Sequence, residues 1–152
     1  MPKSGPHFSD KHEAQSKRSS HLAAISLLVP DYDSAITHYC QGLGFDLIED
    51  TDLGPDSSGN TKRWVLVAPP GSRETRLLLA RAAKPEQVAQ IGHQAGGRVF
   101  LILYTDDFAG DHARFSAAGV TFMETPREEP YGTVAVFRDA FGNLWDLLQP
   151  IS

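Results

Sequence analysis

The sequence predicts an α+β domain built from two copies of one β-α-β-β-β unit. Three observations predict this class: an apolar strand pattern occurs twice, an Asp-capped amphipathic helix follows each time, and three further strand patterns follow each helix. The capping residues are Asp31 or Asp33 in the first copy and Asp106 or Asp107 in the second. Tyr39 and Phe115 each stand eight residues after Asp31 and Asp107, respectively. This equal spacing indicates an internal duplication.

The first copy occupies about residues 21–82 and begins with an apolar strand. That strand runs from Leu22 to Val29 and is stopped by Pro30. The helix after it carries one apolar stripe, formed by Ala35, Ile36, Tyr39, Cys40 and Leu43. Three more strands are predicted at 45–49, 62–68 and 76–80, with a polar loop between the first two.

A connector over residues 83–97, with a short helix from Pro85 to Ile91, leads to the second copy at about residues 98–150. That copy begins with a strand at 99–104, and its helix carries Phe108, Phe115 and Ala118 inward. The remaining strands are predicted at 120–124, 133–137 and 144–149. The segment 126–132 reads as a charged surface loop, or alternatively as a rim whose Tyr131 closes over a ligand.

Length and composition predict one soluble intracellular domain. The 152 residues, 41% of them apolar, are enough to bury a sizeable core, while residues 1–20 are polar and predict a flexible tail. A net charge of −5 argues against a nucleic-acid partner. The single cysteine, Cys40, excludes an internal disulfide and indicates a reducing cytoplasm. No apolar run approaches the roughly 20 residues that span a membrane.

The most specific motif is Asp139-Ala-Phe-Gly-Asn-Leu-Trp-Asp-Leu-Leu-Gln149. Its first part favours a tight turn, and its second part is a strand that places Asp146 on one face between leucines. This stretch resembles the last strand of the vicinal oxygen chelate superfamily, the glyoxalase, bleomycin-resistance and extradiol dioxygenase group. Val29-Pro-Asp-Tyr, Leu43-Gly-Phe, Asp106-Asp107-Phe and Gly119-Val-Thr-Phe extend the match. The resemblance implies eight strands that curl around a central cup.

In metal-dependent members of that superfamily, the cup holds one divalent ion. The resemblance places its ligands on the first and last strands of each unit, which here are Ala24, Leu77-Leu78-Leu79, Phe100 and Asp146. Among these side chains the Asp146 carboxylate alone can bind a metal. We therefore expect neither a metal nor another cofactor; an atypical site, or one completed by a partner subunit, is the alternative.

Strand alternation predicts which side chains line the cup. With the rim residue Tyr131 included, the predicted ligand-binding residues are Ala24, Ser26, Leu28, Trp64, Phe100, Ile102, Tyr104, Tyr131, Leu144 and Asp146. The phase of two strands stays open, with Val65 as the alternative to Trp64 and with Val134 or Ala135 on the wall.

Asp146 and Tyr104 are the catalytic candidates, and each has a simpler interpretation. Asp146 could be a partly solvated strand residue paired with an arginine, and Tyr104 a wall residue. His38 and His112 are expected on helix surfaces, and the Cys40 thiol is expected to be inert.

Three functions fit these residues. The first is a glyoxalase/bleomycin-resistance-type protein without most metal ligands, which binds a small, largely hydrophobic molecule in a crevice shared by two subunits of a homodimer. The second is a glyoxalase-like lyase or isomerase, or another enzyme of the superfamily, either metal-independent with Asp146 and Tyr104 transferring protons or with an atypical metal site. The third is a domain that binds only partner proteins. The missing ligands favour the first, and the net charge favours a cationic ligand.

Overall fold

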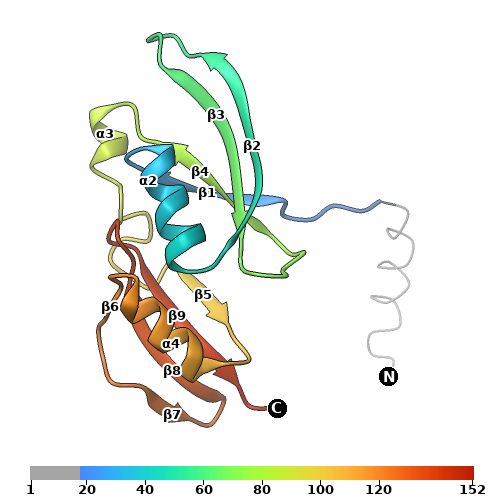
Figure 1. The fold of residues 1–152 in the computed structure, drawn as a ribbon, viewed down its shortest axis with the longest axis vertical. Helices are drawn as coiled ribbons and strands as arrows, with labels where there is room; N and C mark the ends of the chain where they lie inside the picture. The colour runs from blue at the N-terminus through green and yellow to red at the C-terminus, as the bar shows by residue number, and fades with distance from the viewer. Residues whose placement is uncertain (1–17) are drawn as a thin grey trace, which may run out of the picture.

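The computed structural model describes residues 18–152, which form two twisted sheets (Figure 1). The first sheet has the order β1-β4-β3-β2 and contains β1 (Ala24–Val29), β2 (Asp46–Pro55), β3 (Thr61–Ala68) and β4 (Arg76–Arg81). The second has the order β5-β9-β8-β6, with β7 paired to β8, and contains β5 (Leu101–Tyr104), β6 (Thr121–Phe122), β7 (Arg127–Glu129), β8 (Gly132–Arg138) and β9 (Leu144–Pro150). β1 runs parallel to β4, and β5 to β9. The predicted α+β class with a duplicated unit is confirmed.

Each sheet carries one main helical segment, begun by an aspartate as predicted. α2 (Tyr32–Ile36) starts after Asp31, whose carboxylate accepts a hydrogen bond from Ser34 N at 2.7 Å, and this bond lowers the Asp31 pKa. α4 (Phe108–Ala117) starts after Asp107, which accepts from Gly110 N at 3.1 Å. A side chain at position 110 would displace the Asp107 carboxylate from its capping position, so glycine leaves room for this cap.

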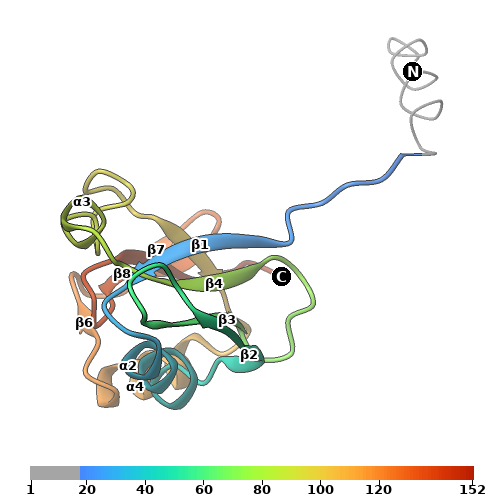
Figure 2. The same cartoon turned by 90° about the horizontal axis from the view of Figure 1, so that it is seen from above.

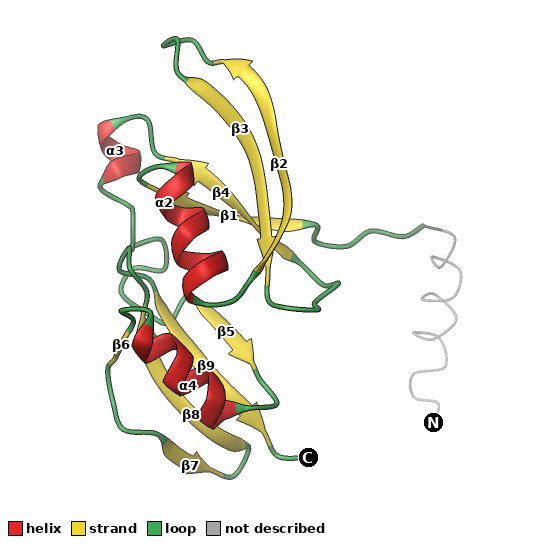
Figure 3. Cartoon of the chain, viewed as in Figure 1, coloured by secondary structure: helices red, strands yellow, loops and turns green. Residues whose placement is uncertain are grey.

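Two further helical segments are present, one π-helical and one a short α-helix. α2 continues as a π-helical turn over Thr37–Gly42. The short helix α3 (Pro85–Val88) lies in the connector, as Figure 3 shows.

The helices cover one face of each sheet and leave the other open. α2 and α4 lie on the same side of the molecule (Figure 2). Helix-facing residues are buried: Leu27, Val29, Val65, Val67, Leu77 and Leu79 in the first sheet, and Leu103, Ala135, Phe137, Trp145 and Leu147 in the second. The opposite faces, called the open faces below, carry the alternate residues. Their exposure matters for function because large apolar side chains lie on them.

A buried carboxylate, Asp139, joins the two halves. It is 4% exposed and accepts hydrogen bonds from Tyr39 Oη at 2.6 Å, Trp145 Nε1 at 2.9 Å and Asn143 Nδ2 at 3.1 Å. Backbone amides of Phe141 and Asn143 donate to its other oxygen. Burial, followed by the Asp139 charge, raises the pKa of Tyr39 far above its ordinary value, so Tyr39 stays a donor. The turn before β9 is thereby tied to the first helical segment.

Several element boundaries differ from the sequence predictions. β2 continues to Pro55 instead of ending at Glu49, because irregular antiparallel pairing with β3 carries it through two register shifts (Figure 1). The charged segment 126–132, predicted as a loop, contains β7, which pairs with β8. α3 ends at Val88 rather than Ile91, and β6 keeps two of the five predicted residues, Thr121 and Phe122. Cross-strand pairing, which local patterns do not encode, sets these limits.

His38 and His112 were predicted on the surface, and both predictions are wrong. His38 is 8% exposed, and its Nε2 accepts a hydrogen bond from Ala140 N at 3.1 Å. Burial lowers the pKa of His38, which keeps Nε2 available as an acceptor. His112 is half-buried and stacks on Phe122 with 3.9 Å between ring centroids. Both rings therefore belong to the packing between helix and sheet.

Most of the predicted tail, residues 1–20, lies outside the described residues. Its last three residues, Arg18, Ser19 and Ser20, are described and are exposed. Within residues 18–152, the helices are too short and too polar to cross a membrane.

Replacing Tyr39 by Phe tests the role of Asp139. The change removes one donor from a buried carboxylate, so we expect the free energy of unfolding to fall by about 1–3 kcal/mol. Tyr104→Phe, at an exposed tyrosine, is the matched control and should change stability by less than about 0.5 kcal/mol. Urea unfolding followed by circular dichroism measures both variants. Equal stability of the two would refute the assigned role.

Candidate functional site

The open face of the second sheet brings the predicted catalytic residue Asp146 next to large apolar side chains. Asp146 on β9 lies opposite Ile102 on β5 and Val136 on β8. Tyr104, one pleat further along β5, lies opposite Leu148 on the same face. Ile102 is 62% exposed and Tyr104 is 69% exposed, and both lie on β5, the edge strand of the second sheet. An uncovered surface of this kind is typical of a binding site.

A charged cluster flanks Asp146 at the β7 side of this face. Arg127 Nε contacts Glu124 Oε1 at 3.0 Å, and Arg127 Nη1 contacts Glu129 Oε2 at 2.6 Å. Glu124 also accepts a hydrogen bond from Val136 N at 2.9 Å, so this carboxylate is fixed against the strand. These bonds lower the pKa of Glu124 and raise that of Arg127, and both groups stay charged.

Asp146 has no such partners within the described part of the chain. Burial raises its pKa, the Arg127 guanidinium opposes that rise, and the Glu124 charge adds to it. Among residues 18–152, no Lys, Arg or His nitrogen lies within 4.0 Å of its carboxylate, so the predicted pairing with an arginine is not formed as a direct contact. A half-buried carboxylate with a raised pKa can donate or accept a proton nearer neutral pH than an ordinary aspartate.

The open face of the first sheet is formed by β1, β4 and β3. Ser26 lies opposite Leu78, and Leu78 lies opposite Leu66. Because Val65 points to the helix side and is buried, Trp64 is the β3 residue that shares the open face. On β8, Val134 pairs with Leu148 and so lies on the face of Tyr104, while Ala135 pairs with Leu147 on the helix side; Val134 and Leu148 are nevertheless buried.

The outer edge of β1 is covered by a connector side chain that the sequence reading did not identify. Gln94 Oε1 accepts from Leu28 N at 2.7 Å, and Gln94 Nε2 donates to Ser26 O at 3.2 Å. The amide thus satisfies backbone groups of an edge strand that would otherwise be open to pairing.

The remaining predicted site residues are dispersed. Ala24 begins β1, Phe100 precedes β5, and Leu144 begins β9. Tyr131 lies in the turn between β7 and β8 and is exposed, at the end of the hairpin rather than on a sheet.

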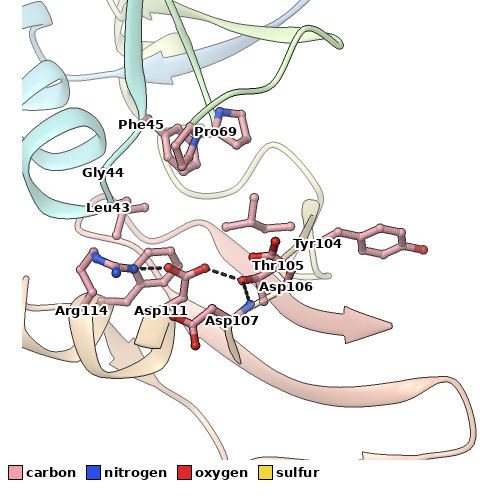
Figure 4. A pocket seen from close by; sticks show the side chains of 13 residues that line it. Leu43, Gly44, Phe45, Pro69, Tyr104, Thr105, Asp106, Asp107, Asp111 and Arg114 are labelled. Carbon is pink, nitrogen blue, oxygen red and sulfur yellow. Dashed lines mark hydrogen bonds and ion pairs between the residues drawn. The ribbon is translucent and has the colours of Figure 1, made fainter. Parts of the chain in front are cut away.

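Two grooves meet near Tyr104. One, of about 470 Å³, lies between the β3–β4 loop and β5, where Pro69, Pro70 and Thr75 approach Ile102 and Tyr104. The other, of about 750 Å³, contains Asp111, which pairs with Arg114 and accepts from Thr105 Oγ1 at 2.6 Å. Figure 4 shows the Tyr104 ring pointing away from this chain of polar groups. Asp146 lines neither groove, so Tyr104 and Asp146 share a sheet face without sharing a groove.

Sequence reasoning also missed Arg76, the first residue of β4. It lies opposite Ala24 and, by alternation with the buried Leu77, faces the open side. Strand alternation could have identified Arg76, because a residue two positions before Leu78 lies on the same face of the strand as Leu78.

The sequence model of the Glyoxalase/Bleomycin resistance protein/Dioxygenase superfamily matches residues 19–147. The chain belongs to this superfamily. The resemblance drawn from the Asp139–Gln149 motif is therefore confirmed. Superfamily membership establishes the kind of fold, and the residues of this chain have to establish what it does.

Relatives within the superfamily cover most of the chain. An uncharacterized protein of Shewanella frigidimarina is 58% identical over 128 residues, which are 84% of this chain and 92% of that protein. The crystal structure of TnmS3, described as an antibiotic binding protein from Streptomyces sp. CB03234, is 34% identical, has a TM-score of 0.66 and is matched over 88% of this chain and 98% of that one. A superfamily member from Sphaerobacter thermophilus is 26% identical with a TM-score of 0.69, over 86% and 98% of the two chains.

A protein-bound metal ion of the catalytic kind needs three or more ligating side chains. Within residues 18–152, no three His, Cys, Asp or Glu side chains come together in an arrangement that could hold one. At the strand positions named above, Ala24, Leu78 and Phe100 offer carbon atoms, and Asp146 offers a single carboxylate. The side chains present do not fit an ion bound in the manner of the metal-dependent members.

Asp146→Asn tests whether Asp146 is kept for stability. A carboxyl whose pKa is raised in the folded protein costs stability as pH rises through that pKa, because the unfolded chain ionises more easily. We therefore expect Asp146→Asn to leave the free energy of unfolding at pH 7 unchanged or slightly higher. Asp139→Asn, the buried counterpart, should lower it by about 2–3 kcal/mol. Urea unfolding at pH 7 compares them, and a large loss for Asp146→Asn would assign that residue to the fold instead.

Proposed function

We propose that this protein binds a small, largely apolar molecule against its open sheet faces, without a metal ion. The observation that supports this most directly is the exposure of Ile102 and Tyr104 on the face that carries Asp146, which has no ion-pair partner among residues 18–152. Exposed apolar side chains on a sheet are costly in water unless a ligand or partner covers them. A site with many apolar atoms and few polar groups suits a ligand with one or two hydrogen-bonding atoms.

The absence of suitable ligating side chains at the superfamily's metal positions supports a metal-free mode. Glu124, a carboxylate whose charge acts on Asp146, is already held by Arg127 and Val136 N. Glu124 could serve as a second metal ligand only if these bonds were broken. The similarity to TnmS3, an antibiotic binding protein by its description, supports ligand sequestration for a chain that is 34% identical to it.

A metal-independent enzyme is the second candidate, and the raised pKa of Asp146 favours it. In that case Asp146 is the acid or base and Tyr104 lies beside the substrate on the same face. Mass spectrometry of a recovered ligand separates the two candidates, because a binder returns its ligand unchanged.

We further propose that the protein is a cytoplasmic homodimer. Each open face needs a cover, and a projecting β2–β3 hairpin carries exposed Leu47, Ile48 and Leu53 that a second copy could bury (Figure 1). A crevice between two subunits would then enclose the ligand from both sides. Sedimentation at micromolar concentration tests this proposal, and a monomer would contradict it.

A pair of exposed-site variants tests ligand binding. N-phenyl-1-naphthylamine, an uncharged apolar dye, should bind the wild type saturably with increased fluorescence. Ile102→Glu places a charge on the open face and should raise the Kd at least about tenfold, because the carboxylate would have to lose water. Val88→Glu, at a residue of α3 that is similarly exposed, is the matched control and should leave the Kd unchanged. Equal effects of both substitutions, or no saturable binding, would contradict the proposal.

A further inference from the structure

Arg76 stands on the open face of the first sheet, where its side chain has no ion-pair partner among residues 18–152. Its neighbours in β4, Leu77 and Leu79, are buried against the helix side, so Arg76 and Leu78 project to the open side. Directly opposite on β1 is Ala24, a small residue that leaves space beside the arginine. On this face of β1 and β4, the other residues are uncharged: Ala24, Ser26, Leu28, Leu78 and Ala80.

The Arg76 Nε is buried and has no hydrogen-bond partner, and no other side-chain nitrogen or oxygen in residues 18–152 shares this condition. Arg63, Arg81, Arg114 and Arg127 each contact an Asp or Glu. Arg73, Arg98 and Arg138, which have no such contact among residues 18–152, are exposed to water. Leaving a charged donor buried and unpaired costs more free energy than a neutral one. Native proteins rarely retain such a group unless something outside the chain satisfies it.

The position of Arg76 links it to the apolar site. It lies on the open face of the first sheet, on the same side of β4 as Leu78, which pairs with Ser26 and Leu66. An apolar molecule that covers this open face would meet the guanidinium at the start of β4. A guanidinium at that point offers paired N–H donors in the geometry that two-oxygen anions accept.

We propose that Arg76 recognises an oxyanion, of the carboxylate or sulfonate kind, on the small apolar ligand of this protein. The proposal rests on the proposed function and specifies the ligand class as an apolar acid. It also revises the expectation of a cationic ligand drawn from the net charge of −5. Net charge acts at long range and is screened by salt, whereas a guanidinium acts on an oxyanion by direct contact.

A matched pair of dyes tests the proposal. 8-Anilinonaphthalene-1-sulfonate and N-phenyl-1-naphthylamine share the same ring system, and the first adds a sulfonate. Fluorescence titrations compare wild type with Arg76→Gln, Arg76→Lys and Arg73→Gln. Arg73 is an exposed loop arginine that precedes β4, so its substitution removes the same charge at a nearby position off the open face.

We expect Arg76→Gln to weaken sulfonate-dye binding about tenfold or more and to leave the uncharged dye unaffected. Arg76→Lys should retain part of the affinity, and Arg73→Gln should retain nearly all of it. Unchanged sulfonate-dye affinity in Arg76→Gln, with the uncharged dye still bound, would overturn the role of Arg76 and leave the proposed function standing. Failure of both dyes to bind wild type would overturn the proposed function itself. A loss of dimer on sedimentation of Arg76→Gln, without a dye effect, would assign Arg76 to the subunit interface instead.

Discussion

The buried carboxylate of Asp139 is the interaction on which the relative placement of the two units depends. It accepts hydrogen bonds from Tyr39 in the first unit and from Trp145 and Asn143 in the second. No cation neutralises it among residues 18–152, so its charge is stabilised by hydrogen-bond donors alone. The adjacent Ala140 N–H donates to His38, which adds a second bond between the same two units. The Thr37–Gly42 segment also packs against α4, so the helices cover the buried faces of both sheets and leave the other faces open (Figure 2).

This arrangement separates the residues that hold the fold from those available for binding. Aromatic rings pack near Asp139. The ring of Tyr39 contacts those of Phe45, Phe141 and Trp145, with ring centroids 5.9 to 6.3 Å apart. On the open faces, Ile102, Tyr104 and Asp146 make few bonds to the rest of the chain. A ligand site can therefore vary in sequence while the packing on the helix side is retained.

The sequence was sufficient for the order of elements, because the Asp31 and Asp107 caps and the strand alternation are local signals. Strand alternation also placed Asp146 and Ile102 on one face of the sheet, although their role in binding remains a proposal. The Asp139 motif was read as a turn, and its function as a hydrogen-bond centre was missed because Tyr39 lies 100 residues away in sequence. His38, β7 and the length of β2 were mispredicted for the same reason: their partners lie on other strands or on the other unit. Arg76 was not predicted because the three leucines that follow it indicate a buried strand, and strand alternation alone does not show whether an arginine has a partner.

The central claim is that the open faces, and not the helix side, receive the ligand. The most direct test is an amide chemical-shift map of isotope-labelled protein titrated with 8-anilinonaphthalene-1-sulfonate. Shifts centred on Ser26, Leu78, Ile102 and Asp146 would agree with the account. Shifts confined to the groove between the helices, where Ser34, Gln41 and Ala118 lie, would contradict it.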